Sequence, residues 1–409
     1  MVSNNNLKLS FQLKELFSYK YFCIFWICRV IGITSYQILI VALAWQLYDL
    51  TSNPLDLGLI GLFQFLPVLL LSLPAGQIVD RFHKGKILGF CFFFQSVVAL
   101  WLSYSSFHES ISKNSFFVIA TILGVLRTFQ MPTQQSLTPS LVPRRLLQNA
   151  IAFSSSGMHT AIIVGPAIGG FLYILGAEVV YVICASLLAI SFLLTFLIKY
   201  KYEKSLEKIS LNNLLAGLKF ILRNKTLLGA ISLDLFAVLL GGATALLPVF
   251  AKDILDVGPE GLGFLRASPA VGALICALLM TKWPIEEKVG EKLFFSVAIF
   301  GIAMMVFGLS TNFFLSIIAL IVSGAADSLS VVIRMTLIQL DTPNHMRGRV
   351  SSVNAIFIGA SNELGEFESG VTASFFGPVN SILIGSIGTV VIVLAWAKFF
   401  PSLLKRSKL

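Results

Sequence analysis

The sequence predicts an all-α polytopic membrane protein whose twelve membrane-spanning helices form two pseudo-symmetric halves of six. Three observations predict this fold class. Of the 409 residues, 56% are hydrophobic and 12% are charged, with a mean hydropathy of +0.86. Apolar stretches of about 20 residues, enough to cross the hydrocarbon core of a bilayer, recur along the chain. Glycines and prolines of the first half recur 200 residues later in the second half. A water-soluble domain could not bury this much apolar surface.

Twelve apolar stretches are long enough to span a bilayer, and a polar segment separates the first six from the last six. They cover residues 21–48, 57–79, 87–106, 115–137, 149–174, 178–199, 227–251, 262–282, 292–310, 313–338, 350–375 and 379–401. Inside the polar segment, residues 211–222 have the periodicity of an amphipathic helix that lies on the membrane surface. We therefore expect five parts: an amphipathic N-terminal segment (1–20), a six-helix bundle (21–199), a linker (200–225), a second six-helix bundle (226–402) and a basic tail (403–409).

An internal repeat relates the two sets of stretches. Each half contains six stretches, an even number, so both halves begin on the same side of the membrane. The repeat is therefore a parallel one about an axis normal to the membrane. Chance matches are the alternative, and the shared loop positions argue against them. Counterparts 205 residues later exist for Leu50, Pro54, Leu57 and Gly58, and counterparts 200 residues later exist for Gly124, Leu137, Pro143, Gly165 and Gly170.

The net charge of +10 reflects membrane topology. Lysine and arginine concentrate at the termini and in every second loop, whereas the alternate loops hold almost none beyond Lys113 and Lys252. By the positive-inside rule this distribution places both termini in the cytoplasm, where basic loops contact anionic lipid headgroups and not nucleic acid. The five cysteines all lie within apolar stretches, so we expect reduced packing residues and neither disulfides nor a metal site.

A short loop between the second and third apolar stretches carries a dense pattern of charge. Gly76 is followed four residues later by Asp80, and then by Arg81 and Lys84. The glycine lets two helix ends approach, the aspartate can pair through charge, and the basic residues hold the loop in the cytoplasm. The loop resembles the one between helices 2 and 3 of the major facilitator superfamily of secondary transporters. This resemblance implies a gating role for the four residues; a generic positive-inside loop is the alternative.

Further motifs resemble those of facilitator antiporters. Gly165 and Pro166 in the fifth stretch resemble the glycine–proline motif of helix 5, which implies a role in gating, although such residues also serve ordinary helix packing. Arg127 in the fourth stretch resembles the helix-4 arginine associated with proton coupling, but Met131 stands where that motif has glycine. The alternative is a structural arginine bonded to carbonyls. At residues 44–48, 343–350 and 361–370 the chain also resembles the branch that contains enterobactin exporters and macrolide efflux proteins.

Three glutamates lie in the eleventh apolar stretch. At 100° per residue, Glu363 and Glu366 share a helical face, whereas Glu368 lies about 140° from Glu363. Three ionised and unpaired carboxylates would cost about 7–10 kcal/mol on insertion scales, so they must be protonated, paired or hydrated. Each is therefore either a candidate proton carrier or part of a structural ion pair. The candidate partner is Arg266, at a similar depth in the eighth stretch.

Other polar residues in the apolar stretches are candidates for a central cavity, which helices 1, 4, 7 and 10 line in the superfamily that this chain resembles. Arg29 and Asp234 occupy matching positions in the two halves, so they either pair as a gate or are solvated separately. Asp234 is also a candidate for proton coupling. His159 in the fifth stretch either makes a local hydrogen bond or titrates during transport. The full set of cavity candidates is Arg29, Gln37, Gln130, Asp234, Asp327, Arg334 and Arg266.

The resemblance implies a secondary transporter that works by alternating access. We expect proton-coupled export of a small amphiphilic or siderophore-like molecule across a bacterial cytoplasmic membrane, by a monomer in the lipid bilayer. The proton gradient would supply the energy, with no cofactor, metal, nucleic acid or enzymatic activity. Intramembrane arginines favour an anionic substrate and carboxylates a cationic one, so the charge of the substrate stays open. A lysophospholipid flippase of the same fold and a non-transporting receptor or scaffold are the alternatives.

Overall fold

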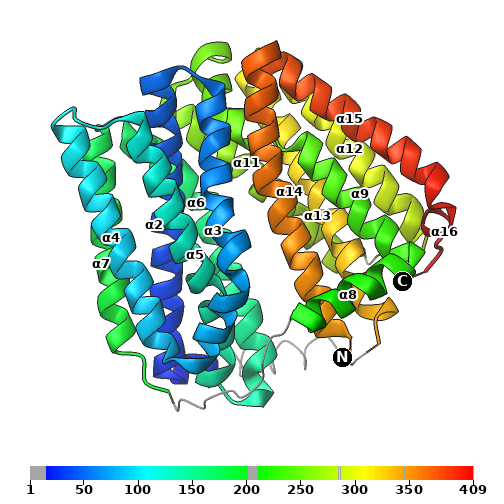
Figure 1. Cartoon of the computed structure of the whole chain (residues 1–409), viewed down its shortest axis with the longest axis horizontal. Coiled ribbons are helices and arrows are strands. Elements are labelled where there is room, and N and C mark those ends of the chain that lie inside the picture. Colours follow the sequence, from blue (N-terminus) through cyan, green and yellow to red (C-terminus); the bar gives the residue numbers. More distant parts are fainter. Residues whose placement is uncertain (1–14, 201–210, 284, 286, 344–345, 409) are drawn as a thin grey trace. The chain divides into compact units, whose positions relative to one another are not determined.

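The computed structural model describes residues 15–200, 211–283, 285, 287–343 and 346–408, and all regular structure in these ranges is helical (Figure 1). Most of the expected N-terminal amphipathic segment, residues 1–14, lies outside the described residues, as do residues 201–210 of the linker. The rest of the linker forms α8 (Leu211–Arg223), which confirms the helix that the periodicity of residues 211–222 predicts.

The first half of the chain forms six long helices, one for each predicted apolar stretch. A single turn of 3₁₀-helix, η1 (Arg144–Leu146), precedes the fifth of them. Prolines lie inside three of the six, and a proline removes one backbone hydrogen bond and favours a bend. The six helices are α2 (Lys20–Thr51), α3 (Pro54–Arg81), α4 (Lys84–Phe107), α5 (Lys113–Leu141), α6 (Leu147–Tyr173) and α7 (Ala177–Phe196).

The second half differs from a simple repeat of the first at its first helix. The predicted stretch 227–251 is broken: α9 (Lys225–Gly241) ends beside Gly242, whose backbone leaves the helical region. The chain continues through η2 (Ala243–Leu246), α10 (Leu247–Val249) and a π-helical turn, η3 (Phe250–Ile254). The helices that follow are α11 (Gly258–Lys282), α12 (Val289–Leu309), α13 (Phe313–Asp341), α14 (Arg347–Phe376), α15 (Pro378–Phe399) and α16 (Pro401–Leu404).

Eleven helical segments of the described chain are long and apolar enough to cross a membrane, one fewer than the sequence predicts. The remaining predicted span, 350–375, does form a helix, α14, of 30 residues. At about 1.5 Å per residue, α14 is long enough to cross a bilayer. It fails on composition, because it carries two arginines near its start and three glutamates further on. The exact count of twelve spans is therefore not confirmed.

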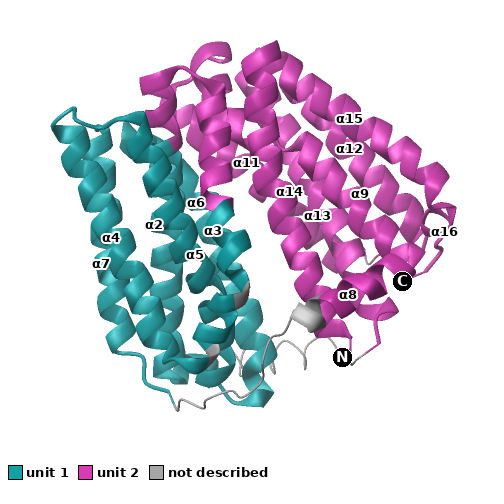
Figure 2. Ribbon diagram, viewed as in Figure 1, with its two compact units in different colours: residues 1–43, 66–208 teal, residues 44–65, 209–409 magenta. Residues whose placement is uncertain are grey.

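The chain divides into two compact units, shown in teal and magenta in Figure 2. Unit 1 contains residues 1–43 and 66–208, and unit 2 contains residues 44–65 and 209–409. The boundary differs from the one expected at the linker, because the end of α2 and the beginning of α3 group with the second half. Small residues explain this grouping: the Cα of Gly58 on α3 would lie 2.7 Å from a Cβ at Gly370 on α14, so the two helices nearly touch.

Close helix packing through small residues also builds the interior of each unit. In unit 1, a Cβ at Gly165 of α6 would lie 2.6 Å from the Cβ of Gln37 on α2. In unit 2, a Cβ at Gly272 of α11 would lie 1.9 Å from the carbonyl oxygen of Ile321 on α13. Side chains larger than hydrogen would push these helices apart, as is typical of membrane helix interfaces.

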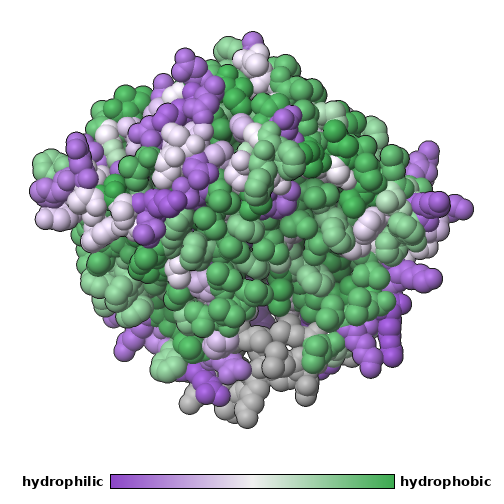
Figure 3. Space-filling view, turned by 45° about the horizontal axis from the view of Figure 1, so that its top comes forward, coloured by the Kyte–Doolittle hydropathy of each residue, from purple (hydrophilic) through white to green (hydrophobic). Residues whose placement is uncertain are grey.

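Large apolar side chains are exposed on the outer faces of the helices. Phe107, Phe314 and Phe375 are each more than two-thirds exposed, and on the face in Figure 3 apolar side chains cover most of the middle of the view. Soluble monomers rarely expose contiguous apolar areas of this kind. The lipid tails of a bilayer solvate such a surface without cost.

Candidate functional site

The interior of unit 2 contains a buried ion pair between α13 and α9. Arg334 Nη1 lies 2.7 Å from Asp234 Oδ2, and both side chains are at least nine-tenths buried. Arg334 Nη1 is also 3.5 Å from Oδ1 of Asn354 on α14. A charge at such depth in a membrane protein is tolerated only with a partner, so the two residues stabilise each other. The pair lies within one unit, and the sequence analysis had instead considered Arg29 as a partner for Asp234.

A second carboxylate, Asp327, belongs to the same cluster. It lies seven residues before Arg334 on α13, close to two full turns, so both residues are on one face of the helix. Because helical side chains tilt towards the N-terminus, Arg334 leans towards Asp327. Asp327 is within electrostatic range of both Asp234 and Arg334. We call Asp234, Asp327 and Arg334 the core triad; with all three groups ionised, its net charge is −1.

The three glutamates of α14 lie beside glycines of α3 and the break in α9. Glu366 packs on α3, where a Cβ at Gly61 would be 3.1 Å from Glu366 Oε2. Gly365 lies against α9, and a Cβ there would be 2.9 Å from the carbonyl oxygen of Val238. Glu368 Oε1 accepts a hydrogen bond of 2.7 Å from Thr372. Glu363, Glu366 and Glu368 are all half-buried, and the helix that carries them packs on the interrupted helix through Gly365 and Ser369, whose hydroxyl donates a 3.1 Å hydrogen bond to the carbonyl oxygen of Gly242. Broken membrane helices commonly line binding sites in transporters.

In unit 1 the polar interior consists mainly of amides and arginines. Gln95 on α4 donates a 2.9 Å hydrogen bond to Oε1 of Gln130 on α5, and both side chains are buried. Arg29 on α2 lies with Nη2 3.7 Å from the sulfur of Met158. Arg127, on α5, is half-buried. The Cβ of Gln37 packs against Gly165, as described above, and its place in a cavity stays a prediction.

Two sequence candidates take positions that the sequence pattern does not reveal. His159 is exposed on the surface of α6, although the sequence places it in the middle of an apolar stretch. Helical phase decides this, because Gly157 on the buried face of α6 packs against Trp26 while His159 lies two residues, or about 200°, further round. Arg266 is half-buried on α11 of unit 2, and its pairing with a glutamate stays a prediction.

The loop between α3 and α4 is attached to other elements of unit 1. Lys84 Nζ donates a 3.0 Å hydrogen bond to the carbonyl oxygen of Ser136 on α5, and the backbone N–H of Lys84 donates to the Tyr200 hydroxyl at 2.7 Å. The His83 ring lies 4.7 Å from the Tyr200 ring, centroid to centroid. Burial, followed by the charge of Lys86, lowers the pKa of His83. These contacts fix the start of α4.

The other residues of the predicted gating motif are less informative. Gly76 and Arg81 lie in the last turns of α3, and the side chain of Asp80 lies outside the described residues. Gly165 and Pro166 are buried in α6. The gating role of this set stays a prediction.

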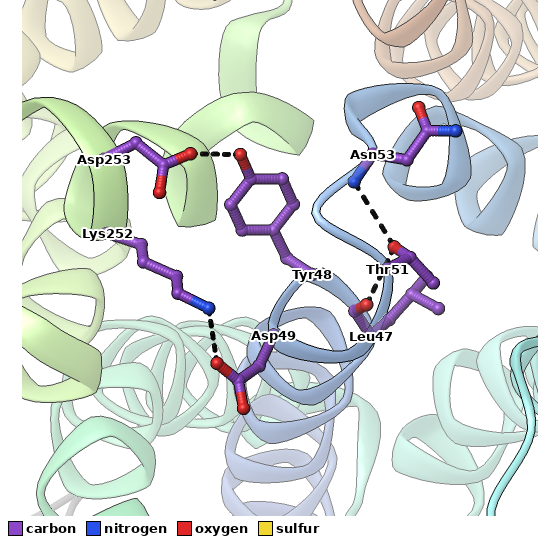
Figure 4. A network of polar contacts seen from close by, with 7 residues as sticks. All are labelled: Leu47, Tyr48, Asp49, Thr51, Asn53, Lys252 and Asp253. Carbon is purple, nitrogen blue, oxygen red and sulfur yellow. Dashed lines mark hydrogen bonds and ion pairs between the residues drawn. The ribbon is translucent and has the colours of Figure 1, made fainter.

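A polar cluster that the sequence analysis missed joins the end of α2 to η3 within unit 2 (Figure 4). The Tyr48 hydroxyl donates a hydrogen bond to Asp253, and Lys252 forms an ion pair with Asp49. The Lys252 ammonium also lies 5.9 Å from the centre of the Tyr48 ring. We call Tyr48, Asp49, Lys252 and Asp253 the rim cluster. One signal was present in the sequence, because Lys252 is one of the few basic residues in the alternate loops.

The π-helical turn explains how consecutive residues reach the same partner helix. Lys252 and Asp253 both lie in η3, and both contact the last turn of α2, as the side chains in Figure 4 show. In an ordinary α-helix consecutive side chains diverge by 100°, whereas the wider π turn changes this spacing. π-Helical turns occur frequently at functional sites. In the described residues, no group of three or more histidine, cysteine or acidic side chains is arranged to hold a metal ion.

The chain matches one family along almost its whole length. The family described as "Transmembrane secretion effector" matches residues 15–405. Three relatives cover most of the chain: the staphyloferrin A transporter of Staphylococcus aureus (25% identity; 87% of this chain, 90% of the relative), macrolide efflux protein A of Streptococcus pyogenes (23%; 90% and 93%) and the enterobactin exporter EntS of Escherichia coli (23%; 90% and 88%).

Solved structures show the same fold. The inward-facing, unoccupied crystal structure of a bacterial homologue of the human lysosomal transporter Spinster has a TM-score of 0.73 and 14% sequence identity. The match covers 94% of this chain and 96% of that one. The family match and the three relatives confirm the resemblance to efflux transporters of the major facilitator superfamily.

Proposed function

Because the chain belongs to the transmembrane secretion effector family of the major facilitator superfamily, we propose that it couples proton uptake to the export of a small amphiphilic or siderophore-like molecule. It is a secondary transporter of the efflux type and not an enzyme. It is also an integral multi-pass bacterial membrane protein. The proposal concerns the substrate class, the proton coupling and the residues that carry both.

The core triad is the observation that carries the proton-coupling proposal. Arg334 is permanently charged and pairs with Asp234 at 2.7 Å, which leaves Asp327 as the carboxylate in excess. A proton bound to Asp327 changes the net charge of the triad from −1 to zero. A charge in the membrane interior costs about 2.5–3.5 kcal/mol on insertion scales, so this change is large enough to favour one conformation over another.

The glutamates of α14 supply a second set of groups that can exchange protons. They lie next to the interrupted helix, where backbone carbonyls and N–H groups can reach a substrate. The names of three relatives support the substrate class, because two transport siderophores and one exports macrolides. We propose that proton binding to the carboxylates of unit 2 and substrate binding favour opposite conformations of the transporter, which makes the movements of proton and substrate opposite.

The remaining parts of the proposal follow from charge distribution. Both termini are cytoplasmic, since basic residues concentrate at the termini and in every second loop. The protein works as a monomer in the bilayer and needs no cofactor beyond the proton gradient. A cysteine at the exposed Lys219 of α8 should then react with an impermeant thiol reagent only from the cytoplasmic side. Labelling from outside would show that the proposed orientation in the membrane is wrong.

The proposal is tested by transport assays on purified protein in liposomes. The panel contains siderophores, a macrolide, a cationic dye and a lysophospholipid, each under an imposed pH gradient with proton flux recorded. Wild-type protein should move one class against the proton flux. Asp327→Asn should retain substrate binding and lose the response to the gradient. Asp341→Asn removes a carboxylate from the same helix, where it pairs with Arg406 at 2.9 Å, and is the matched control.

The other outcomes point to other functions. Lysophospholipid movement without proton flux would identify a flippase. If folded protein transports none of the compounds in the panel, a receptor or scaffold function would be favoured. A gradient response that persists in Asp327→Asn would remove the core triad from the coupling mechanism.

A further inference from the structure

A groove on the outer surface of unit 1 lies between α4 and α7. It has a volume of about 630 Å³, and phenylalanines from both helices line it, among them Phe90, Phe94, Phe192 and Phe196. Gly85 and Gly89 of α4, one turn apart, are also part of its lining, and Gly89 lets α4 approach α7 closely, because a Cβ there would lie 2.6 Å from the Thr195 hydroxyl oxygen. Phe90 and Phe196 are each at least 60% exposed, so the groove is open to whatever surrounds the helices.

One end of the groove is basic. Lys86 and His83 line it there, and the exposed Lys199 directly follows Ile198, another lining residue. Among the side chains that the structure describes, no aspartate or glutamate lines the groove. A long apolar channel with cations at one end matches a molecule with an apolar tail and an anionic head.

The same pair of helices provides a control with the opposite charge. Further along α4 and α7, a second groove of about 590 Å³ is lined by Leu100, Tyr104, Phe107 and Val182, and its ionisable residue is Glu178. It is similar in size to the first groove, and among the described residues no lysine, arginine or histidine lines it, although His108 follows Phe107 and its ring lies 4.5 Å from that of Tyr104. The two grooves therefore differ mainly in that lysines stand at the first and a glutamate at the second.

We propose that the groove between α4 and α7 at Lys86 is a binding site for an anionic phospholipid of the surrounding membrane. The acyl chain lies along the phenylalanines, and the phosphate group lies at Lys86 and His83. The second groove takes acyl chains without preference for an anionic head. This site is separate from the core triad and does not depend on the direction or the coupling of transport.

The site adjoins the contacts that hold the loop between α3 and α4. Lys84, two residues before Lys86, donates to the carbonyl oxygen of Ser136 and to the hydroxyl of Tyr200, and His83 packs on the ring of Tyr200. A phosphate bound here would place a negative charge next to the ammonium groups of Lys84 and Lys86. Occupancy of the groove therefore stabilises the start of α4 against the segment that follows α7.

The test is photo-crosslinking with phospholipids that carry a diazirine in the acyl chain. Purified protein is placed in vesicles of phosphatidylcholine doped with a trace of either phosphatidylglycerol or phosphatidylcholine probe, and labelled peptides are mapped by mass spectrometry. We expect the anionic probe to label residues 85–94 and 192–198 more strongly than the zwitterionic probe does. Labelling of the second groove, at residues 100–107 and 178–183, should be equal for both probes.

Variants identify the charge that is responsible. A basic residue near an anionic surface contributes about 1 kcal/mol, so Lys86→Gln should reduce anionic labelling of the first groove about fivefold. Lys113→Gln removes a lysine from the start of α5 and should change nothing. Excess inorganic phosphate should not displace the lipid, because it lacks the acyl chain. Equal labelling by both probes, unchanged labelling in Lys86→Gln, or displacement by phosphate would overturn the proposal. Each readout is independent of transport, so the proposed lipid site can be refuted without refuting the proposed function, and the reverse.

Discussion

The membrane interiors of unit 1 and unit 2 differ in charge, because carboxylates accompany the arginines only in unit 2. The apolar stretches of unit 1 contain Arg29 and Arg127, and every acidic residue of that unit lies at or beyond the end of a stretch. Carboxylates occupy the middle of the stretches in unit 2. They are Asp234, Asp327, Glu363, Glu366 and Glu368. Since an arginine keeps its charge at any physiological pH, Arg29 and Arg127 offer fixed positive charge in unit 1, whereas the carboxylates of unit 2 can exchange protons.

The two units, which largely correspond to the two halves of the internal repeat, would therefore have different roles in a coupled transporter. Fixed charge can attract or orient an anion at all pH values. Exchangeable charge can respond to a proton gradient. The comparison therefore predicts that changes to the core triad or the glutamates of unit 2 alter stability or pH response, whereas changes to Arg29 or Arg127 of unit 1 alter the rate or the affinity.

The largest effect is expected from splitting the buried ion pair of unit 2. Removing one partner of a buried pair leaves an uncompensated charge and costs about 3–5 kcal/mol. Asp234→Asn and Arg334→Gln should therefore each lower the thermal unfolding temperature in detergent strongly. The double variant should recover part of the loss, because Asp327 is then the remaining carboxylate of the core triad and a bound proton makes it neutral.

A more exposed pair in the same unit is the control for that experiment. Arg406 and Asp341 also lie 2.9 Å apart, but Arg406 is about one-third exposed. Asp341→Asn should cost far less than Asp234→Asn, because water solvates the remaining charge. Equal losses at both sites would show that burial of the core pair does not matter.

The core pair also shows where sequence reasoning succeeds and where it stops. Apolar length and internal repetition predict the helices and their order, because both are local properties of the chain. The partner of Asp234 depends on how α9 and α13 pack, which no spacing encodes, and so the sequence left Arg29 as a candidate when Arg334 is the partner. The break in α9 was missed for a similar reason, since Gly242 lies within an unbroken apolar run.

The same reasoning applies to the remaining surprises. His159 lies on the exposed side of α6, which hydropathy cannot show because lipid-facing and buried positions are equally apolar around it. The rim cluster joins residues 48–49 to residues 252–253, and its geometry depends on a π-helical turn. Composition does predict that α14 differs from the other long helices, since its glutamates exclude it from the apolar spans.

The next largest effect is expected on the pH dependence of transport. Glu366→Gln should bring the ratio of the transport rates at acidic and alkaline pH several-fold closer to one, because an amide cannot take up a proton. Arg127→Gln in unit 1 should lower the rate at all pH values and leave that ratio unchanged. The readout is substrate flux in liposomes over a pH series. A flattened profile in Arg127→Gln, with a normal one in Glu366→Gln, would reverse the assignment of the two units.

A smaller effect is expected at the rim cluster. Lys252 and Asp49 are both partly exposed, and exposed ion pairs contribute about 0.2–1 kcal/mol. Lys252→Gln should hardly change the unfolding temperature, yet it should alter the transport rate if η3 must separate from α2 during the cycle. The exchanged pair, Lys252→Asp with Asp49→Lys, should restore the wild-type rate. A rate that stays normal in both single variants would leave the cluster with a purely structural role.

The smallest effect is expected at His83, outside the membrane-spanning helices of unit 1. Burial and the nearby Lys86 lower its pKa, so the folded state prefers the neutral ring. The unfolded chain binds a proton near the ordinary pKa of about 6.5, and this lowers the stability of the folded state as the pH falls through that value. His83→Gln should remove this part of the acid sensitivity. Below about pH 6.5 the unfolding temperature of the variant should rise relative to wild type, and above that pH the difference between them should be smaller. His108→Gln is the control for loss of an exposed histidine. If His83→Gln loses stability at acidic pH relative to wild type, the folded protein holds His83 in its charged form, and the environment attributed to the start of α4 is wrong.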